Sequence, residues 1–582
     1  MCFAKDAESD IFVENDVFGF ISIYFLLALL NRTRRRIKQG FLWHVFNRRS
    51  VPSHGENIRL PADLVIINAN IRTLNPNQPV AQALAIKKNR IVKVGTNQEI
   101  NQLIDKGTLV VSLDGKTVVP GLIDTHIHVA DFGRCLMWLD LTCAESIREI
   151  QDLLKAKVQQ TPAGKWVIGR GWNQVRFKEK RLLTLSDLDV AAPDNPVILY
   201  HEAAMMCAVN SKAIAAANLT EHTAVPEGGT VDKNPQTGKL TGILRDTATN
   251  LIWQAVPEPS IDELSEATAI ACRKIVEAGI TSVHWLVLSE SELSIIQRLP
   301  VQGKLLVRVN VVVPEALLQK TVGFQSSDLL MLHVGGVGID VDGYLDSKTA
   351  ALSQPYSDEP NNSGKLLYSE AELAASVWQV LAVGLQPVIH AMGDKAVDTA
   401  LLVIEQTASA RGVRFRIEQA AVLNEELIKR LKAQKVVVSV QPKVIATEFA
   451  VWSATERLGF ERARWLHPLK TLVKEGVKVV GGSDCPMESL SPLLGMQEAV
   501  LRASFPEQRL TLGEALSMYT VDAAYSSCEE KVKGSIEEGK LADLTVLSVD
   551  PFAVPANEIK DVNVEMTIID GKVVYSKHPL GR

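Results

Sequence analysis

The sequence predicts an α/β protein: a TIM-like (β/α)8 barrel with a small β-sandwich domain formed from both ends of the chain. From about residue 120 to 526, apolar runs of strand length alternate with amphipathic helical stretches, a pattern typical of parallel strands joined by helices. On either side, short segments alternate apolar and polar residues around turn signals, which is typical of half-buried strands. For a chain of 582 residues, a closed eightfold barrel is the commonest arrangement of such parallel strands.

The predicted domain boundaries divide the chain into four segments. Residues 1–58 form an N-terminal extension with a short apolar segment and a basic linker. Residues 59–119 supply the first part of the β-sandwich, residues 120–530 form the barrel, and residues 531–582 supply the second part of the sandwich.

Composition excludes several classes of protein. With 46% hydrophobic and 22% charged residues, the chain can bury a large core and is not intrinsically disordered. The net charge of −5 gives no basic footprint for nucleic acid. The 7 cysteines are scattered and contain no C-x-x-C pair, which favours reduced thiols and a cytoplasmic location over a secreted disulfide framework.

The N-terminal extension leaves membrane contact open. Its apolar run, Val17–Leu30, has about 14 residues, fewer than the roughly 20 that a spanning helix needs. Acidic residues precede the run and basic residues follow it up to Lys38, which is the reverse of a secretory signal. Residues 17–38 could therefore contact a membrane with the rest of the chain in the cytoplasm, form a peripheral helix, or add nothing to the fold.

Both parts of the predicted sandwich show strand patterns. The first part contains Ala62–Leu74 and Ala83–Gly95, where apolar and polar residues alternate around turn-prone residues. The second part contains Lys540–Pro551 and Val564–Ser576, and its Asp570-Gly571 pair is a strong hairpin signal. We expect these strands to pair in one small composite domain.

The barrel segment contains the clearest buried strands of the sequence. Amphipathic stretches such as Ser369–Gly384 and Asn424–Gln434 are candidates for the helices between them. The strand candidates are Pro196–His201, Gly279–Leu288, Leu385–Ala391, Val436–Pro442 and Val477–Asp484.

A histidine pair ends one apolar run, in VVPGLIDTHIHVADFG (Val118–Gly133). On a strand, residues i and i+2 project to the same side, so His126 and His128 would present two imidazoles together. Two such nitrogens are a ready pair of metal ligands. A single H-x-H also arises by chance, so its meaning depends on the ends of the other strands.

Two further residues of ligand type end other apolar runs. His390 lies in VIHAMGD, and Asp484 lies in VVGGSDCP, where Gly481 and Gly482 allow close backbone approach. Each has a plain alternative, since His390 could be a hydrogen-bonded core residue and Asp484 a helix N-cap. Because the loops after barrel strands build the active site of such a fold, the joint pattern predicts a metal centre there.

Seven motifs then follow one another along residues 62–576: PGLIDTHIH, GRGWNQ, GILRD, TAALSQPYSD, VIHAMGDKA, GSDCP and GSIEEGKLADLTVL. Together they resemble the amidohydrolase superfamily, and within it the amidohydrolase 3 branch, which includes N-substituted formamide deformylase-like proteins. The resemblance implies one or two divalent metal ions and hydrolysis of carbon–nitrogen bonds other than peptide bonds. It also implies the barrel and the composite sandwich.

The resemblance assigns roles residue by residue. Trp172 and Arg245 match family motif positions and become candidate substrate-binding residues, although each could simply brace its loop. Asp484 is implied as the proton-transfer base as well as a ligand. The implied metal ligands are His126, His128, His390 and Asp484.

Four positions depart from the family pattern. Gln419 stands where I-E-H-A has a metal-site histidine, and Gly338 stands where many members have a bridging lysine. Met205 and Lys443 replace two further histidines. Because an amide is a poor substitute for imidazole and glycine offers no bridge, these changes favour a mononuclear site with one Zn²⁺. Gln419 and Met205 become candidate substrate-binding residues.

Asp340 offers one compensation for Gly338. Gly338, Asp340 and Asp342 alternate along one predicted strand and should share a face, so Asp340 could reach toward the place of the missing lysine. The plain alternative is a strand-end aspartate that meets solvent or a helix N-terminus.

Two functional hypotheses follow. The first is a metal-dependent hydrolase with a mononuclear site, in which a metal-activated water attacks a small-molecule amide and Asp484 moves the proton. The second is a catalytically degenerate protein of the same fold that binds a metal or a small molecule, motivated by the four departures. The resemblance makes a homodimer a reasonable expectation.

Overall fold

The computed structural model of the chain describes residues 61–202, 206–321, 324, 326, 328–407 and 413–579. The predicted apolar segment with its basic flank (17–38) and Met205 lie outside the described residues. Within these described ranges, no helix is long and apolar enough to cross a membrane.

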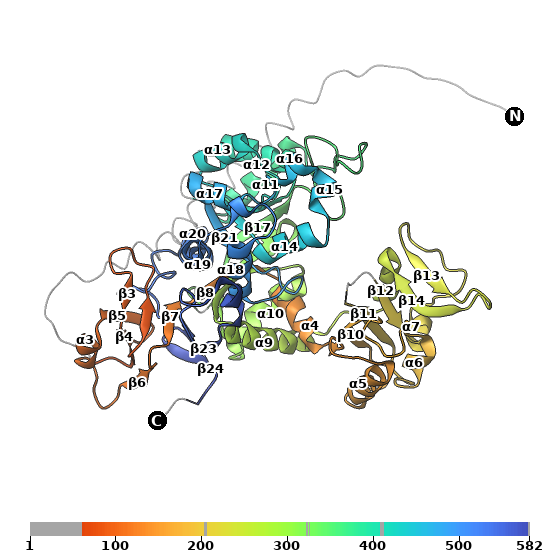
Figure 1. Cartoon of the computed structure of the whole chain (residues 1–582), viewed down its shortest axis with the longest axis horizontal. Coiled ribbons are helices and arrows are strands. Elements are labelled where there is room, and N and C mark those ends of the chain that lie inside the picture. The colour runs from red at the N-terminus through yellow and green to blue at the C-terminus, as the bar shows by residue number, and fades with distance from the viewer. Residues whose placement is uncertain are drawn as a thin grey trace, which may run out of the picture. The chain divides into compact units, whose positions relative to one another are not determined.

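Eight parallel strands form the predicted barrel (Figure 1). They follow one another in sequence order around the sheet, and the chain just after the last strand closes the ring: the Asp484 amide donates to the His126 carbonyl at 2.8 Å. The TIM-like fold is therefore confirmed. The strands are β8 (Leu122–Ile127), β15 (Ile280–Leu286), β16 (Arg308–Pro314), β17 (Leu332–Asp340), β18 (Gln386–Ala391), β19 (Arg416–Gln419), β20 (Val437–Val440) and β21 (Lys478–Gly481).

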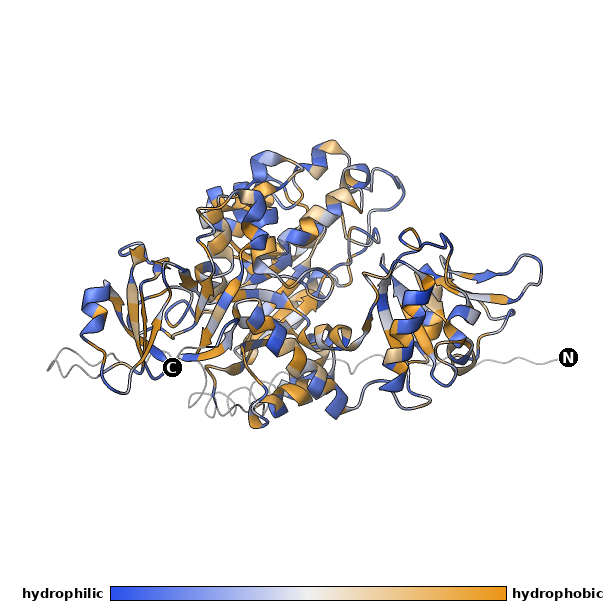
Figure 2. Ribbon diagram, turned by 60° about the horizontal axis from the view of Figure 1, so that its bottom comes forward, coloured by the Kyte–Doolittle hydropathy of each residue, from blue (hydrophilic) through white to orange (hydrophobic). Residues whose placement is uncertain are grey.

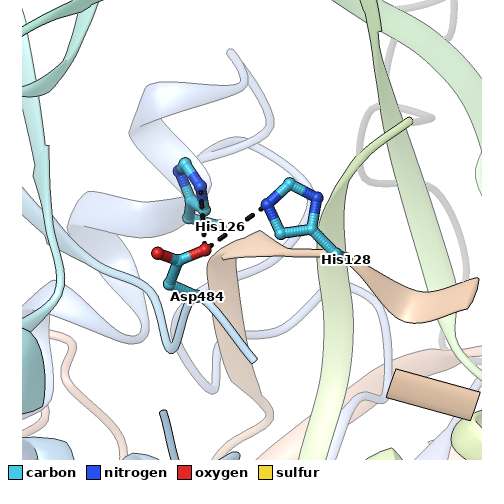
Figure 3. A group of neighbouring side chains, drawn as sticks. All are labelled: His126, His128 and Asp484. Carbon is cyan, nitrogen blue, oxygen red and sulfur yellow. Dashed lines mark ion pairs between the residues drawn. The ribbon is translucent and has the colours of Figure 1, made fainter. Parts of the chain in front are cut away.

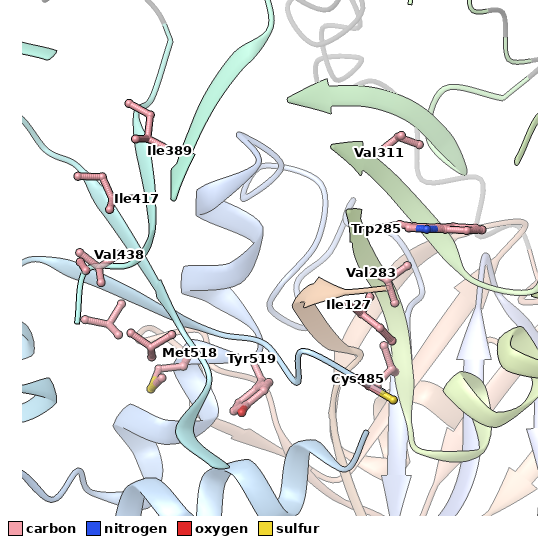
Figure 4. Packing of buried hydrophobic residues seen from close by; sticks show 14 of the residues in the cluster. Ile127, Val283, Trp285, Val311, Ile389, Ile417, Val438, Cys485, Met518 and Tyr519 are labelled. Atoms are coloured by element: carbon pink, nitrogen blue, oxygen red, sulfur yellow. The ribbon is translucent and has the colours of Figure 1, made fainter. Parts of the chain in front are cut away.

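Helices cover the outside of the barrel and pack on its strands. Ile389, Ile417 and Val438 come from neighbouring strands and belong to one large hydrophobic cluster (Figure 4). Hydrophobic and hydrophilic residues alternate along the helices in Figure 2, as expected for helices that bury one face. The helices between and after the strands are α4 (Val129–Met137), α9 (Ile261–Glu277), α10 (Glu290–Val301), α11 (Glu370–Ala382), α12 (Asp394–Thr407), α13 (Glu425–Ala433), α14 (Pro442–Ala450), α15 (Ala454–Leu458), α16 (Phe460–Ala463), α17 (Leu469–Glu475), α18 (Pro492–Leu501), α19 (Leu512–Met518) and α20 (Val521–Ser526).

Helix starts agree with local capping signals. Ser369 caps α11 with a capping box to Glu372, and Asn424 caps α13 by accepting from the Leu427 amide. Both helices lie inside the segments for which the sequence predicts them.

The composite sandwich contains strands from both ends of the chain. In its six-stranded sheet, β7 pairs antiparallel with β22, with Val118 opposite Val546, so the two ends share one sheet. The four-stranded sheet has the order β5-β4-β1-β6, and a hydrophobic cluster joins it to the other sheet. The strands are β1 (Leu64–Ile67), β2 (Asn70–Arg72), β3 (Val80–Ala81), β4 (Ala83–Lys87), β5 (Arg90–Gly95), β6 (Leu109–Ser112), β7 (Thr117–Pro120), β22 (Leu544–Leu547), β23 (Val564–Ile569) and β24 (Lys572–Ser576), with α3 (Asn97–Asn101) after β5.

A third sheet, which is not among the predicted elements, lies between the first and second barrel strands in sequence. The run Pro196–His201, predicted as a barrel strand, instead forms β11 of this mixed sheet. Its apolar composition is the same in either setting, so composition alone could not separate the two. The sheet contains β9 (Leu139–Asp140), β10 (Val167–Trp172), β11 (Val197–His201), β12 (Met206–Val209), β14 (Leu240–Arg245) and β13 (Thr230–Lys233), with α5 (Ile147–Gln159), α6 (Leu185–Asp189), α7 (Ser211–Ala216) and α8 (Asn250–Trp253).

Glu292, near the start of α10, has a buried carboxyl group that contacts Trp285 of the barrel strand β15. It is 5% exposed, and its Oε2 accepts a hydrogen bond from the Trp285 indole at 3.1 Å. Burial raises its pKa to about 7, and the charge of Asp131 adds to the increase. The folded protein therefore favours the neutral acid, whereas the unfolded chain ionises near the ordinary value.

We expect wild-type stability to fall as pH rises from about 4.5 to 7, because folding then opposes ionisation of Glu292. Glu292→Gln keeps an acceptor for Trp285 and should remove this loss, which amounts to at most about 3 kcal/mol. Urea midpoints at pH 5 and pH 8 measure it. Glu290→Gln changes an exposed neighbour and is the control. A pH-dependent difference no larger than that of the control would contradict the expectation.

Candidate active site

His126, His128 and Asp484 meet at the C-terminal end of the barrel strands (Figure 3). His126 lies near the end of β8, His128 follows that strand, and Asp484 lies in the loop after β21. Asp484 Oδ1 is 3.5 Å from His126 Nε2 and 3.4 Å from His128 Nε2. One ligand atom from each of the three residues lies within 4.8 Å of the others. The predicted convergence of these residues is thus present.

The other ring nitrogens fix how the two imidazoles point. His128 Nδ1 lies 3.1 Å from the Leu286 carbonyl, which only accepts, so Nδ1 carries the proton. His126 Nδ1 lies 2.7 Å from the Glu418 carboxylate, which favours the same tautomer. Both Nε2 lone pairs are then left for a cation, as in metal sites whose ligands are oriented by outer hydrogen bonds.

The buried ion pair between Arg416 and Glu418 lies next to the His126 ring, and neither residue was among the predicted site residues. Arg416 Nε contacts the Glu418 carboxylate, and the two side chains are 0% and 2% exposed. Burial opposes the charge of Glu418, but Arg416 and His126 outweigh it and lower its pKa to about 2. Arg416 also donates to His284 Nδ1 at 2.6 Å, so His284 is a hydrogen-bonded core residue. Glu418 is held as a charged acceptor for His126.

Replacing Glu418 with glutamine should weaken metal binding about 10- to 100-fold, because His126 loses its charged orienting partner. The measurement is a Zn²⁺ or Co²⁺ titration of metal-stripped protein. Glu448→Gln is a matched control, since it removes another buried carboxylate beside a histidine, His467 at 3.1 Å. Equal metal affinity in both variants would show that Glu418 has no orienting role.

Close backbone approach holds the first strand against the loop that carries Asp484. Asp124 Oδ1 accepts from the backbone amides of His126 at 3.1 Å and Ser483 at 3.0 Å. A Cβ on Gly482 would lie 2.6 Å from His126 Cβ, so this position requires glycine. The predicted close approach at Gly482 is confirmed, and it places Asp484 next to the histidines.

Neighbouring charges shift the pKa values of His126 and Asp484 in opposite directions. Burial opposes protonation of His126, but Glu418 and Asp484 outweigh it and raise its pKa to about 10. Burial likewise opposes the charge of Asp484, yet hydrogen bonds from His126 and His128 hold its pKa below the ordinary value. These residues therefore favour a positive charge between them.

His390 lines the same pocket but lies outside the group of three that share 4.8 Å. It is the second-last residue of β18 and is 7% exposed. Neither ring nitrogen has a hydrogen-bond partner among the described residues. Its Nδ1 lies 3.9 Å from Asp342 Oδ1, and its ring contacts that of Tyr344. A buried imidazole without hydrogen-bond partners can accept a ligand, so His390 fits a cation bound in this pocket.

The pocket has a volume of about 140 Å³ and combines this polar group with apolar walls. Gly338 and Asp340 both line it, as their predicted shared face requires. Asp342 does not share that role: it is buried and accepts from the backbone amides of Ala351, Met392 and Gly393. The apolar lining residues are Leu286, Val287, Leu288, Val312, Val313, Pro314 and Val388.

Two of the departures from the family pattern lie at this pocket. Gln419 lines it at 3% exposure with φ +70°, and its Oε1 has no partner within the described structure. A Cβ on Gly338 would meet no atom closer than 3.8 Å, so the space of a longer side chain is open. Lys443 lies elsewhere, 4.0 Å from Glu488, and does not line the pocket.

Trp172 and Arg245, predicted to bind substrate, lie in the third sheet and do not line the barrel pocket. Trp172 is fully buried and its indole donates to the Leu199 carbonyl at 2.8 Å. Arg245 pairs with Asp232 at 2.8 Å. Both residues therefore make their contacts within the third sheet and its loops, and their role in substrate binding stays a prediction.

A parallel barrel with His-x-His at the end of its first strand and an aspartate after its last strand presents a candidate metal site of the kind found in metal-dependent hydrolases. The sequence model of the amidohydrolase family matches residues 109–575, and the chain belongs to that family.

Its relatives include the YtcJ protein of Bacillus subtilis, 34% identical over 80% of this chain and 90% of that one. N-substituted formamide deformylase of Arthrobacter pascens is 28% identical over 88% of this chain and 98% of its own. The crystal structure of an uncharacterized metal-dependent hydrolase from Pyrococcus furiosus superposes with a TM-score of 0.71 at 30% identity. It covers 84% of this chain and 99% of that chain.

Proposed function

We propose that the protein hydrolyses a carbon–nitrogen bond of a small, non-peptide amide at a mononuclear metal site. The observation that carries the proposal is the convergence of His126 Nε2, His128 Nε2 and Asp484 Oδ1, with both Nδ1 atoms already engaged elsewhere. The name of the formamide deformylase relative supports the substrate class. Zn²⁺ is the proposed ion because imidazole and carboxylate ligands suit it, and its coordination can expand from four to five to admit a water molecule.

His126, His128 and His390 would hold the ion together with Asp484. Bound there, a divalent ion lowers the pKa of a water molecule and polarises a carbonyl group. The residues of a second site are incomplete, because Gly338 has no side chain and Gln419 offers only an amide. One ion is therefore the expected stoichiometry.

Asp484 is the group that moves protons. Both of its short contacts to the histidines use Oδ1, which leaves Oδ2 for a proton. It would accept a proton from the attacking water and donate it to the leaving nitrogen within one turnover. Throughout the reaction, the Leu286 carbonyl would hold the orientation of the His128 ring, and the Glu418 carboxylate would hold that of the His126 ring.

Metal analysis and an amide panel test the proposal together. Purified protein should contain about one ion per chain and hydrolyse at least one N-substituted formamide or acetamide. Removal of the ion with a chelator should abolish hydrolysis, and Zn²⁺ should restore it. Stoichiometric metal with no hydrolysis of any amide would instead support the binding-module alternative.

A further inference from the structure

Two carboxylates stand at neighbouring strand ends on one side of the pocket. Asp340 ends β17 and lines the pocket. Glu315 follows Pro314, the pocket-lining end of β16, and begins the 3-10 helix η2 (Glu315–Thr321). Its Oε2 accepts from the Tyr368 hydroxyl at 2.8 Å. Asp340 therefore gives the pocket lining a carboxylate here, and Glu315, which does not line the pocket, adds a second one at the neighbouring strand end.

No lysine or arginine of the described residues pairs with these two carboxylates. No lysine or arginine nitrogen of a described residue lies within 4 Å of Asp340 or Glu315, and no described lysine or arginine lines the pocket. The Asp340 carboxylate at the pocket mouth is thus available to pair with a positively charged group of a ligand.

The amide of Gln419 points independently to a ligand. The proposed ion uses His390, but it does not use this amide. Gln419 lines the pocket at 3% exposure, and its side-chain Oε1 is buried without a hydrogen-bond partner among the described residues. A buried carbonyl oxygen without a donor is satisfied by a hydrogen-bond donor that reaches it, such as an N–H of a bound molecule. The pocket is therefore built to receive a ligand that donates hydrogen bonds.

The walls limit the rest of that ligand. Leu286, Val287, Val312 and Val313 make an apolar lining, and the volume is only about 140 Å³. Such a space suits a short hydrocarbon chain between the metal group and the Asp340 carboxylate.

We infer that the substrate is a cationic amide, with a protonated amine on a short apolar chain that pairs with Asp340 while Gln419 Oε1 accepts an N–H of the substrate. The inference rests on the proposed function, because the amide must lie over His126, His128 and Asp484. Asp340 is then a specificity residue: it binds the distant charge and takes no part in bond cleavage.

The test compares N-(4-aminobutyl)formamide with N-pentylformamide, which has the same length and no charge. Wild-type kcat/KM should favour the cationic substrate by about tenfold. Asp340→Asn should remove this preference by raising KM for the cationic substrate, with kcat and the neutral substrate unchanged. Asp194→Asn, an exposed carboxylate in the loop before β11, is the control and should change neither substrate.

A binding arm separates this inference from the proposed function. Calorimetry with the metal-loaded protein should show butylammonium binding that Asp340→Asn weakens, and weaker binding of 1-butanol. If neither formamide is hydrolysed but butylammonium binds through Asp340, the proposed hydrolysis of such amides fails and the cation site stands. If both formamides are hydrolysed equally, the inference is overturned and the hydrolase stands. Loss of metal from Asp340→Asn would also overturn it, by making Asp340 a ligand.

Discussion

Asp484→Asn is expected to lower kcat by about 10³-fold on any amide that the wild-type protein hydrolyses. Asparagine keeps the shape of the side chain but cannot accept the proton of the attacking water. The carboxylate also lies 3.5 and 3.4 Å from the two imidazoles, so its neutralisation removes a negative charge from the metal group. The measurement is steady-state hydrolysis at saturating metal, and Asp194→Asn is the control.

Excess metal separates the two roles of Asp484. If the carboxylate acts only as a ligand, a high Zn²⁺ concentration should restore both occupancy and kcat in the variant. If it moves the proton, occupancy recovers and kcat does not. Activity within tenfold of wild type at full occupancy would assign the proton transfer to another residue.

Local sequence patterns were sufficient to predict the three residues that meet in Figure 3. His126 and His128 are two residues apart at the end of an apolar run, so strand geometry alone puts them on one side. Gly482, two residues before Asp484, indicates the close contact of this loop with His126. Each of these signals lies within a few residues, and the barrel supplies only the final juxtaposition.

The support for His126 depends on register across the barrel and could not be predicted in this way. Glu418 is on β19 and His126 is on β8, and these strands are not neighbours in the sheet. The alternation of Arg416 and Glu418 does predict a shared face, but not which histidine they would meet. Likewise, the apolar run of β11 gave no sign that its neighbours belong to a separate sheet.

The contact between the barrel and the C-terminal strands depends on a buried charge. Arg308 begins β16 and is 1% exposed. Its guanidinium donates to both oxygens of Asp543, at 2.6 and 2.9 Å, and Nη2 also lies 3.2 Å from Asp570. The Asp543 carboxylate further accepts from the Asp570 amide at 2.9 Å. Burial opposes protonation of Arg308, but Asp543 and Asp570 outweigh it and raise its pKa.

Asp543→Ala should therefore destabilise the protein by about 3–5 kcal/mol, because it leaves a buried guanidinium without its main partner. Denaturant unfolding monitored by tryptophan fluorescence measures the loss. Asp561→Ala removes an exposed carboxylate paired with Lys560 and should cost less than about 1 kcal/mol.

A double variant separates two free energies: the cost of burying Arg308 without its main partner, and the net contribution of the Arg308–Asp543 pair to stability. Arg308→Met combined with Asp543→Leu removes both charges and fills the space with apolar atoms, so most of the lost stability should return. If the double variant is as unstable as Asp543→Ala, the Asp543–Asp570 backbone contact, and not the unpaired arginine, accounts for the loss. If Asp543→Ala is no less stable than Asp561→Ala, the buried pair does not join the barrel to the C-terminal strands.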